Sequence, residues 1–170
     1  MFGFANALLL ALFAAAGVDL VLALRRKAVG QLFTVPHYLF GDWGGEARAR
    51  WGQRAFLLAL MLYEFTVVFC NSMARENWPF LQGQLAPVLD MIMYTLLCGK
   101  ILLGTRYTWR ELFCAGALYF VARWVYFNGQ NIWFLGLVMV LLAAKDVPLR
   151  RSLQAFLGCG VPTLALVEML

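Results

Sequence analysis

The residues that could do chemistry in this sequence are six ionisable side chains within long apolar runs: Asp19, Glu64, Asp90, Lys100, Arg123 and Glu168. A charge near the centre of a bilayer costs roughly 2.5 to 3.5 kcal/mol, so each group needs a partner, a water-filled cavity or a route to the membrane interface. No phosphate-binding loop, nucleophile elbow, HExxH motif or supported carboxylate pair accompanies them. The sequence therefore indicates binding chemistry and assigns no catalytic residue. Whether the protein is an enzyme stays open.

The position of each ionisable group along its apolar run decides whether its side chain can reach the membrane interface. Lys100 lies near the inner end of its run, and Asp19 lies within about two turns of Arg25, so both can extend toward the interface and are expected to be structural. Glu168 lies at the end of the last run. Glu64 lies in the middle of its run, with apolar neighbours on both sides, and has no such route. We expect Glu64 to line a polar cavity; the alternative is a protonated carboxyl that faces lipid.

Asp90 and Arg123 lie in the outer thirds of two consecutive runs. Helices that follow one another across a membrane are antiparallel, so the two side chains are expected at the same depth, where they can form an ion pair. Such a pair would either fix the register of the two helices or contact a substrate. Glu64, Asp90 and Arg123 are therefore the predicted binding residues.

The elements that position these groups follow from the composition. Of the 170 residues, 63% are hydrophobic and 14% are charged, with a mean hydropathy of +0.75, whereas soluble domains carry about 25% charged residues. So few charges cannot cover the surface of a globular domain in water. The composition predicts an all-α, polytopic integral membrane protein, with one transmembrane helical domain over residues 1–170.

A helix needs about 20 apolar residues to cross the hydrocarbon core of a membrane. Six runs meet or approach this length: residues 2–24, 55–70, 85–103, 112–127, 132–144 and 153–170. The last run reaches the final residue without a flanking charge or aromatic anchor, as in a helix that continues. We therefore expect a chain truncated at its C-terminus, with either missing C-terminal helices or a helix–helix oligomer as partner.

The positions of Lys and Arg set the orientation, because cytoplasmic loops retain them. With the N-terminus outside, the inner loops hold all but two of the 14 cations: Arg25, Arg26, Lys27, Arg48, Arg50, Arg54, Lys100, Arg106, Arg110, Lys145, Arg150 and Arg151. Only Arg75 and Arg123 fall elsewhere. The net charge of +5 is thus a topology signal, and no nucleic-acid partner is expected. The basic, aromatic-rich loop from Arg25 to Arg54 is expected to contact anionic membrane lipid.

The four cysteines, Cys70, Cys98, Cys114 and Cys159, lie in apolar runs without a C-x-x-C spacing, and His37 is the one histidine. Neither a disulfide framework nor a zinc site follows from this pattern. We expect buried free thiols, no metal and no cofactor.

Five segments between Arg54 and Arg151 carry a resemblance to a known family: Leu89–Tyr94, Gly99–Leu103, Tyr107–Leu112, Gly129–Asn131 and Ala143–Arg151. Together they resemble the N-terminal membrane region of Wzy-like O-antigen and capsular polysaccharide polymerases and ligases. The resemblance implies a multi-pass protein of the bacterial plasma membrane that takes part in cell-surface polysaccharide assembly, with an undecaprenyl-linked glycan as its partner.

Members of that family are longer and hold their essential arginines and histidine on a large outer loop that this sequence lacks. The resemblance therefore implies either the N-terminal part of such an enzyme or a shortened relative without the catalytic loop. Two other functions stay open: a small six-helix transporter subunit that binds the substrate of an importer, and a non-enzymatic accessory membrane protein. The transporter class resembles a bundle whose N-terminus lies inside, opposite to the predicted orientation.

Overall fold

The computed structural model describes residues 44–69, 72, 80–129 and 133–169, together with separate positions between 7 and 25. Several sequence predictions fall outside these residues. They concern most of the 2–24 run, the loop over 26–43 with His37, Cys70, and most of the outer loop that follows Cys70.

The described residues form an all-α structure, as the sequence predicts. It contains α3 (Gly45–Val68), the π-helical turn η1 (Leu81–Leu85), α5 (Ala86–Leu103), α6 (Trp109–Gly129), α7 (Trp133–Ala144) and α8 (Leu149–Glu168). The bounds of α5 and α7 agree with the predicted runs 85–103 and 132–144 to within one residue. In contrast, α3, α6 and α8 begin before their predicted runs, because the charged residues at their N-termini are helical too.

Local sequence sets two of the helix ends. Gly44 directly precedes α3 with a φ of 91°, in the left-handed region that glycine adopts without strain. Asp146 follows the end of α7 with a φ of 63°, and aspartate is among the few non-glycine residues that tolerate this region. The left-handed residue turns the chain sharply, so that α8 begins at Leu149.

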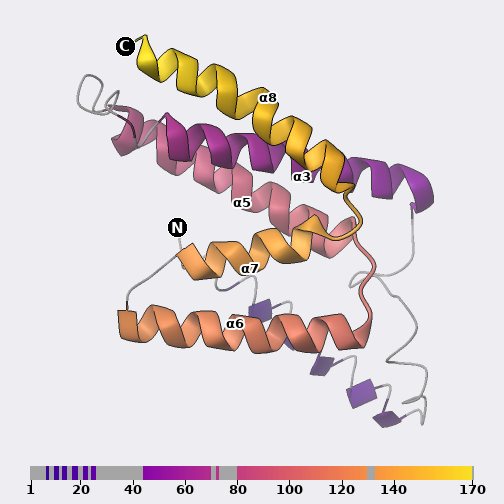
Figure 1. Cartoon of the computed structure of the whole chain (residues 1–170). Coiled ribbons are helices and arrows are strands. Elements are labelled where there is room, and N and C mark those ends of the chain that lie inside the picture. The colour runs from indigo at the N-terminus through magenta and orange to yellow at the C-terminus, as the bar shows by residue number, and fades with distance from the viewer. Residues whose placement is uncertain are drawn as a thin grey trace.

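The order of the helices in space differs from their order in the sequence (Figure 1). Helix α3 packs against both α5 and α8, and α7 packs against both α5 and α6. The order across the bundle is therefore α8, α3, α5, α7, α6. Helix α7 separates α5 from α6, although α5 and α6 are consecutive helices in the chain.

Helix direction alternates along the chain. Helices α3, α6 and α8 begin at the end of the bundle where α5 and α7 finish (Figure 1). We call this end the basic end, because it holds these cations: Arg48, Arg50, Arg54, Lys100, Arg106, Arg110, Lys145, Arg150 and Arg151. The alternation agrees with the up-and-down order that the spacing of the cations predicts.

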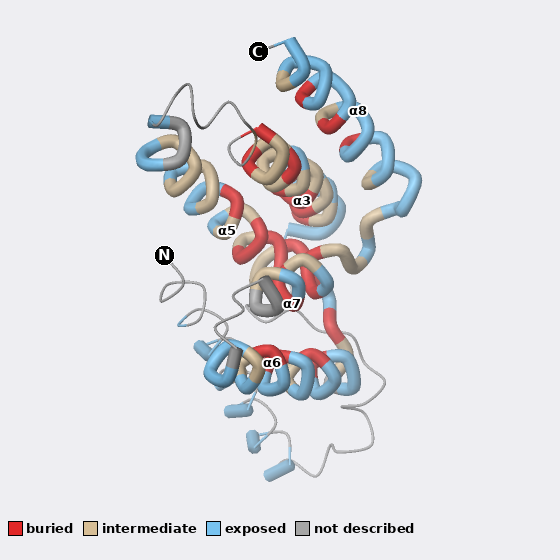
Figure 2. The backbone as a smooth tube through the Cα atoms, turned by 60° about the vertical axis from the view of Figure 1, so that its left-hand side comes forward, coloured by how far each residue is buried: buried red, intermediate tan, exposed pale blue. Residues whose placement is uncertain are grey.

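The core lies where α3, α5, α6 and α7 face one another, and Figure 2 shows their buried residues turned inward. It is built from side chains that are almost wholly buried: Phe56, Ala59, Leu97, Ile101, Tyr119, Ala122, Met139 and Ala143. Small residues on α3, α6 and α7 let the helices approach one another closely.

The outward faces of the helices are apolar as well. Exposed large side chains include Phe113, Phe120, Trp124 and Phe127 on α6 and Leu153, Leu157, Val161 and Leu164 on α8. Within the described residues, one helical segment, Gly83–Leu103, is long and apolar enough by length and composition to cross a membrane.

Candidate functional site

The C-terminus of α7 lies at the centre of the basic end and accepts three hydrogen bonds from other segments. Lys100 on α5 donates from Nζ to the carbonyl of Lys145 over 3.1 Å. Gln53 on α3 donates from Nε2 to the carbonyl of Asp146 over 3.0 Å, and the Tyr107 hydroxyl donates to the carbonyl of Leu142 over 2.9 Å. The last carbonyls of a helix have no partners within it and carry partial negative charge. These donors therefore join α3, α5 and α7 at one point.

A contact between two glycines permits this arrangement. A Cβ atom on Gly104 would lie 2.9 Å from the Cα of Gly52, and one on Gly52 would lie 2.9 Å from Cδ of Lys100. Without these side chains, the backbones of α3 and α5 approach closely enough to enclose the Lys100 side chain, which is 1% exposed. Thr105 donates to the carbonyl of Lys100 over 3.1 Å and continues the network.

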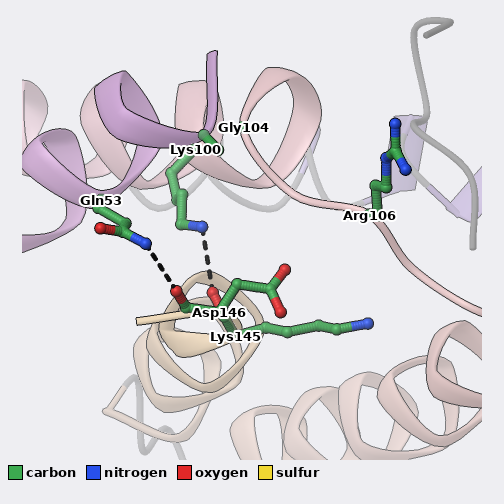
Figure 3. Close-up of a pocket in the computed structure, with 7 residues that line it drawn as sticks. Gln53, Lys100, Gly104, Arg106, Lys145 and Asp146 are labelled. Carbon is green, nitrogen blue, oxygen red and sulfur yellow. Dashed lines mark hydrogen bonds between the residues drawn. The ribbon is translucent and has the colours of Figure 1, made fainter. Parts of the chain in front are cut away.

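A cavity of about 320 Å³ opens beside this network (Figure 3). It is lined by Ala49, Gln53, Lys100, Gly104, Arg106, Lys145 and Asp146. Three cations, a carboxylate and an amide are thus among its lining residues, although Lys100 is bonded to the Lys145 carbonyl and Lys145 is paired with Glu111. Such a set of groups can bind an anion that also carries hydroxyl groups, because cations bind the charge while the carboxylate and amide take hydroxyl hydrogen bonds.

Glu111 anchors the start of α6 to the same network. The Thr108 backbone N–H donates to Glu111 Oε2 over 2.7 Å, and the Glu111 N–H donates to Thr108 Oγ1 over 3.3 Å, a reciprocal cap of the helix N-terminus. Lys145 forms an ion pair with the same carboxylate oxygen. Burial alone would raise the pKa of Glu111, but the bonds from Lys145 and Thr108 outweigh it and lower the pKa.

Tyr107 connects α5 to α6 and is 1% exposed. The Lys145 ammonium lies 5.3 Å from the centre of its ring, within the range of a cation–π contact. Burial raises the pKa of the Tyr107 hydroxyl. The hydroxyl therefore keeps its proton at neutral pH and remains a donor to Leu142.

The predicted binding residue Glu64 lies elsewhere, at the interface of α3 and α8. It is buried, at 8% exposed, and its carboxyl faces Gly160 of α8. The structure therefore places Glu64 away from the cavity at the basic end. Its predicted role in binding stays a prediction.

Asp90 and Arg123 do not form the ion pair that their positions predict. Arg123 donates to the Tyr119 hydroxyl over 3.1 Å and lies over the ring of Phe127. Among the described residues, no ion pair links Arg123 to Asp90. The physical reason is the position of α7, which packs between α5 and α6 and keeps the two side chains apart.

Sequence reasoning misjudged Lys100 and overlooked Gly52 and Gly104. The expectation that Lys100 extends to the interface is wrong, since its side chain is enclosed and bonded to the end of α7. One signal was present: Gly104 follows the lysine by four residues, one helical turn, which places both on the same face of α5. Gly52 carries no comparable signal, because its partner is 52 positions away in the sequence.

The described residues hold no group of three or more His, Cys, Asp and Glu side chains that could bind a metal ion. Cys98, Cys114 and Cys159 are free thiols, and Cys98 is the buried one of the three. Burial of all four cysteines, as predicted from the sequence, is therefore wrong for Cys114, which is exposed on the outward face of α6.

No protein-family model matches this chain, and neither a curated protein nor a solved structure is similar to it.

Proposed function

We propose that this chain is an integral membrane protein of the bacterial plasma membrane, a bundle of about six transmembrane helices with its N-terminus outside. The outward faces of the described helices support this. Trp124 and Phe120 on α6 are 73% and 66% exposed, and Val161 on α8 is 60% exposed. Large apolar side chains gathered on several faces are costly in water and favourable in lipid.

The observation that carries the proposal is the gathering of cations at the basic end. Because helix direction alternates, cations from four helices (α3, α5, α6 and α8) and from the connections between helices lie together there, as on a cytoplasmic membrane face. Of the groups predicted to lie within the apolar runs, Asp90, Arg123 and Glu168 lie toward the opposite ends of their helices. The basic end is therefore assigned to the cytoplasm.

We infer a role in cell-surface polysaccharide assembly, with an undecaprenyl-linked glycan as the ligand. The cavity at the basic end supports this role, because in the assigned orientation it lies near the headgroup layer. Arg106 would bind the phosphate, Lys100 would add positive charge from its enclosed position, and Gln53 and Asp146 would bind sugar hydroxyls. The resemblance of residues 54–151 to the membrane region of Wzy-like polymerases and ligases is the second support.

The orientation is tested by cysteine labelling in intact cells. The native cysteines are replaced, and single cysteines are introduced as Asn128→Cys, at the far end of α6, and Arg150→Cys, at the basic end. An impermeant maleimide is expected to label the first and to reach the second only after the cells are lysed. Labelling of Arg150→Cys in intact cells would contradict the proposed orientation.

Ligand binding is tested on the full chain in phosphatidylcholine nanodiscs. We expect undecaprenyl phosphate to bind and undecaprenol, which lacks the phosphate, not to bind. Arg106→Gln should weaken binding about tenfold, the effect of one charge-assisted hydrogen bond. Arg110→Gln is the matched control, since Arg110 is an exposed cation of the same end that does not line the cavity. Equal binding of the two lipids, or equal losses in both variants, would contradict a phosphate site.

A further inference from the structure

The interface between α3 and α8 keeps a constant register. Arg151 donates from Nη1 to Gln53 Oε1 over 3.0 Å, and two turns further on the Cys159 thiol donates to the carbonyl of Met61 over 3.4 Å. Both pairs are 98 positions apart in the sequence. The two helices therefore run parallel in contact over this length, and the next turn of the interface contains Glu64.

Glu64 occupies a space that a glycine leaves open. A Cβ atom on Gly160 would lie 3.0 Å from Glu64 Oε1, so a side chain at that position would make the carboxyl shift by a few tenths of an ångström. Gly160 and Thr163 are both buried beside it on α8. The Thr163 hydroxyl donates to the carbonyl of Cys159 over 2.6 Å, so its hydrogen is already used.

The described residues supply no counter-charge to the Glu64 carboxyl. Among the described residues, none donates a hydrogen bond to it or forms an ion pair with it. The titratable side chains nearest this level are Tyr63 on α3 itself, Asp90 and Tyr94 on α5, and Cys159 on α8. All four are acids, so none of them supplies positive charge to a carboxylate.

We propose that Glu64 is a proton-binding site of the bundle, occupied by a proton while α8 lies against α3. A carboxylate without a hydrogen-bond donor or a cation is far more costly to bury than the neutral acid. The neutral acid is therefore the state favoured while α8 lies against α3. This inference concerns the α3–α8 interface and does not depend on a ligand at the basic end.

Carbodiimide labelling of the full chain in phosphatidylcholine vesicles tests the proposal. The O–H of a neutral carboxylic acid adds across one C=N bond of the reagent, so that the carboxyl oxygen bonds to carbon and the proton moves to nitrogen. The acyl group then migrates to nitrogen and gives a stable acylurea with no leaving group. We expect dicyclohexylcarbodiimide, which enters apolar regions, to modify Glu64, and a water-soluble carbodiimide to leave it unmodified, as read by peptide mass spectrometry.

The pH profile and the counter-ion identify the bound species. Above the midpoint of the titration, labelling by dicyclohexylcarbodiimide should fall about tenfold per pH unit, because only the neutral acid reacts. Replacement of potassium chloride by sodium chloride should change nothing. Protection by sodium, or equal labelling of Glu64 by both carbodiimides, would overturn the assignment of a proton site.

Two glycine variants of α8 test the structural basis. Gly160→Ala should make the carboxyl shift by a few tenths of an ångström and change the labelling of Glu64 by dicyclohexylcarbodiimide. Gly158→Ala is the matched control, because nothing lies within 4 Å of a Cβ at that position, and its labelling should equal that of the unaltered protein. The same labelling in both variants would mean that Gly160 does not enclose the carboxyl.

Discussion

Lys100 and Glu64 are both charged residues buried between helices, but their surroundings are opposite. The Lys100 ammonium bonds to the carbonyl end of α7, near the carboxylate of Asp146. Glu64 faces a glycine and has neither a cation nor a hydrogen-bond donor among the described residues. The first group is fixed in place by its hydrogen bond to α7, whereas the second has no partner among the described residues.

The difference teaches how to separate structural from functional charges in an apolar bundle. A cation that completes a helix C-terminus replaces the water that the last carbonyls would otherwise need. A carboxyl with no such partner adds nothing to the stability of the fold that an apolar residue could not supply. We therefore expect substitutions at the Lys100 region to affect folding, and substitutions at Glu64 to leave folding intact.

The largest effect is expected from Gly104→Ala. The added Cβ would meet the backbone of Gly52, which cannot move aside as a side chain could, so α3 and α5 must separate. Overpacking of this kind costs about 2 to 3 kcal/mol. The free energy of unfolding in mild detergent, followed by tryptophan fluorescence, measures it. Gly158→Ala is the control, and equal losses in the two variants would show that the glycine contact has no special weight.

Lys100→Met and Glu64→Gln compare the two buried groups directly. Lys100→Met leaves the Lys145 carbonyl without its donor and should lower the free energy of unfolding by about 2 kcal/mol. Glu64→Gln keeps the size of the side chain and should change stability by less than about 0.5 kcal/mol. The same unfolding measurement checks both variants. A larger loss of unfolding free energy in Glu64→Gln than in Lys100→Met would contradict the view that Lys100 stabilises the fold and Glu64 does not.

The remaining predicted binding residues are expected to be independent of one another. Since α7 lies between α5 and α6, the losses from Asp90→Ala and Arg123→Ala should add in the double variant to within about 0.5 kcal/mol. A double-mutant cycle in detergent measures the coupling. Recovery of stability in the double variant would instead support the Asp90–Arg123 ion pair that the sequence predicts.

The smallest effect is expected in the pH dependence of the free energy of unfolding, through Glu111 at the basic end. The lowered pKa of Glu111 means that the unfolded chain binds its proton more readily, so stability is present above the unfolded pKa and is lost as the pH falls through the folded pKa. Because Glu111 is partly exposed, we expect a loss of roughly 0.5 kcal/mol or less between pH 5 and pH 3. Glu111→Gln, which keeps the helix cap, should lack this component, as unfolding titrations at the two pH values would show.

The sequence predicted the helices well because their apolar runs are uninterrupted. The ends of α5 and α7 follow from Gly104 and from the charged pair after Ala144, which are local signals. The neighbours of each helix could not be predicted in this way. Apolar residues surround most of these helices, so periodicity does not indicate which face meets which partner. The insertion of α7 between α5 and α6 was missed for that reason.

The two candidate sites differ in the same way: one follows from a local sequence signal, and the other depends on contacts between distant segments. Glu64 stands out in the sequence because the cost of a charge depends on its depth in one helix, which is a local property. The cavity beside Lys100 does not stand out, because Gln53, Lys100 and Asp146 come from three separate segments. Only the glycine contact and the sharp turn at Asp146 bring them together.

The shortness of α7 has a consequence for the membrane location that we propose. Twelve residues rise about 18 Å, whereas the hydrocarbon core is about 30 Å thick. Its C-terminus is fixed at the basic end by donors from Lys100, Gln53 and Tyr107. In the proposed bilayer, these twelve residues would therefore cover only part of the hydrocarbon thickness. In the proposed membrane, thinner bilayers should therefore match α7 better than thicker ones.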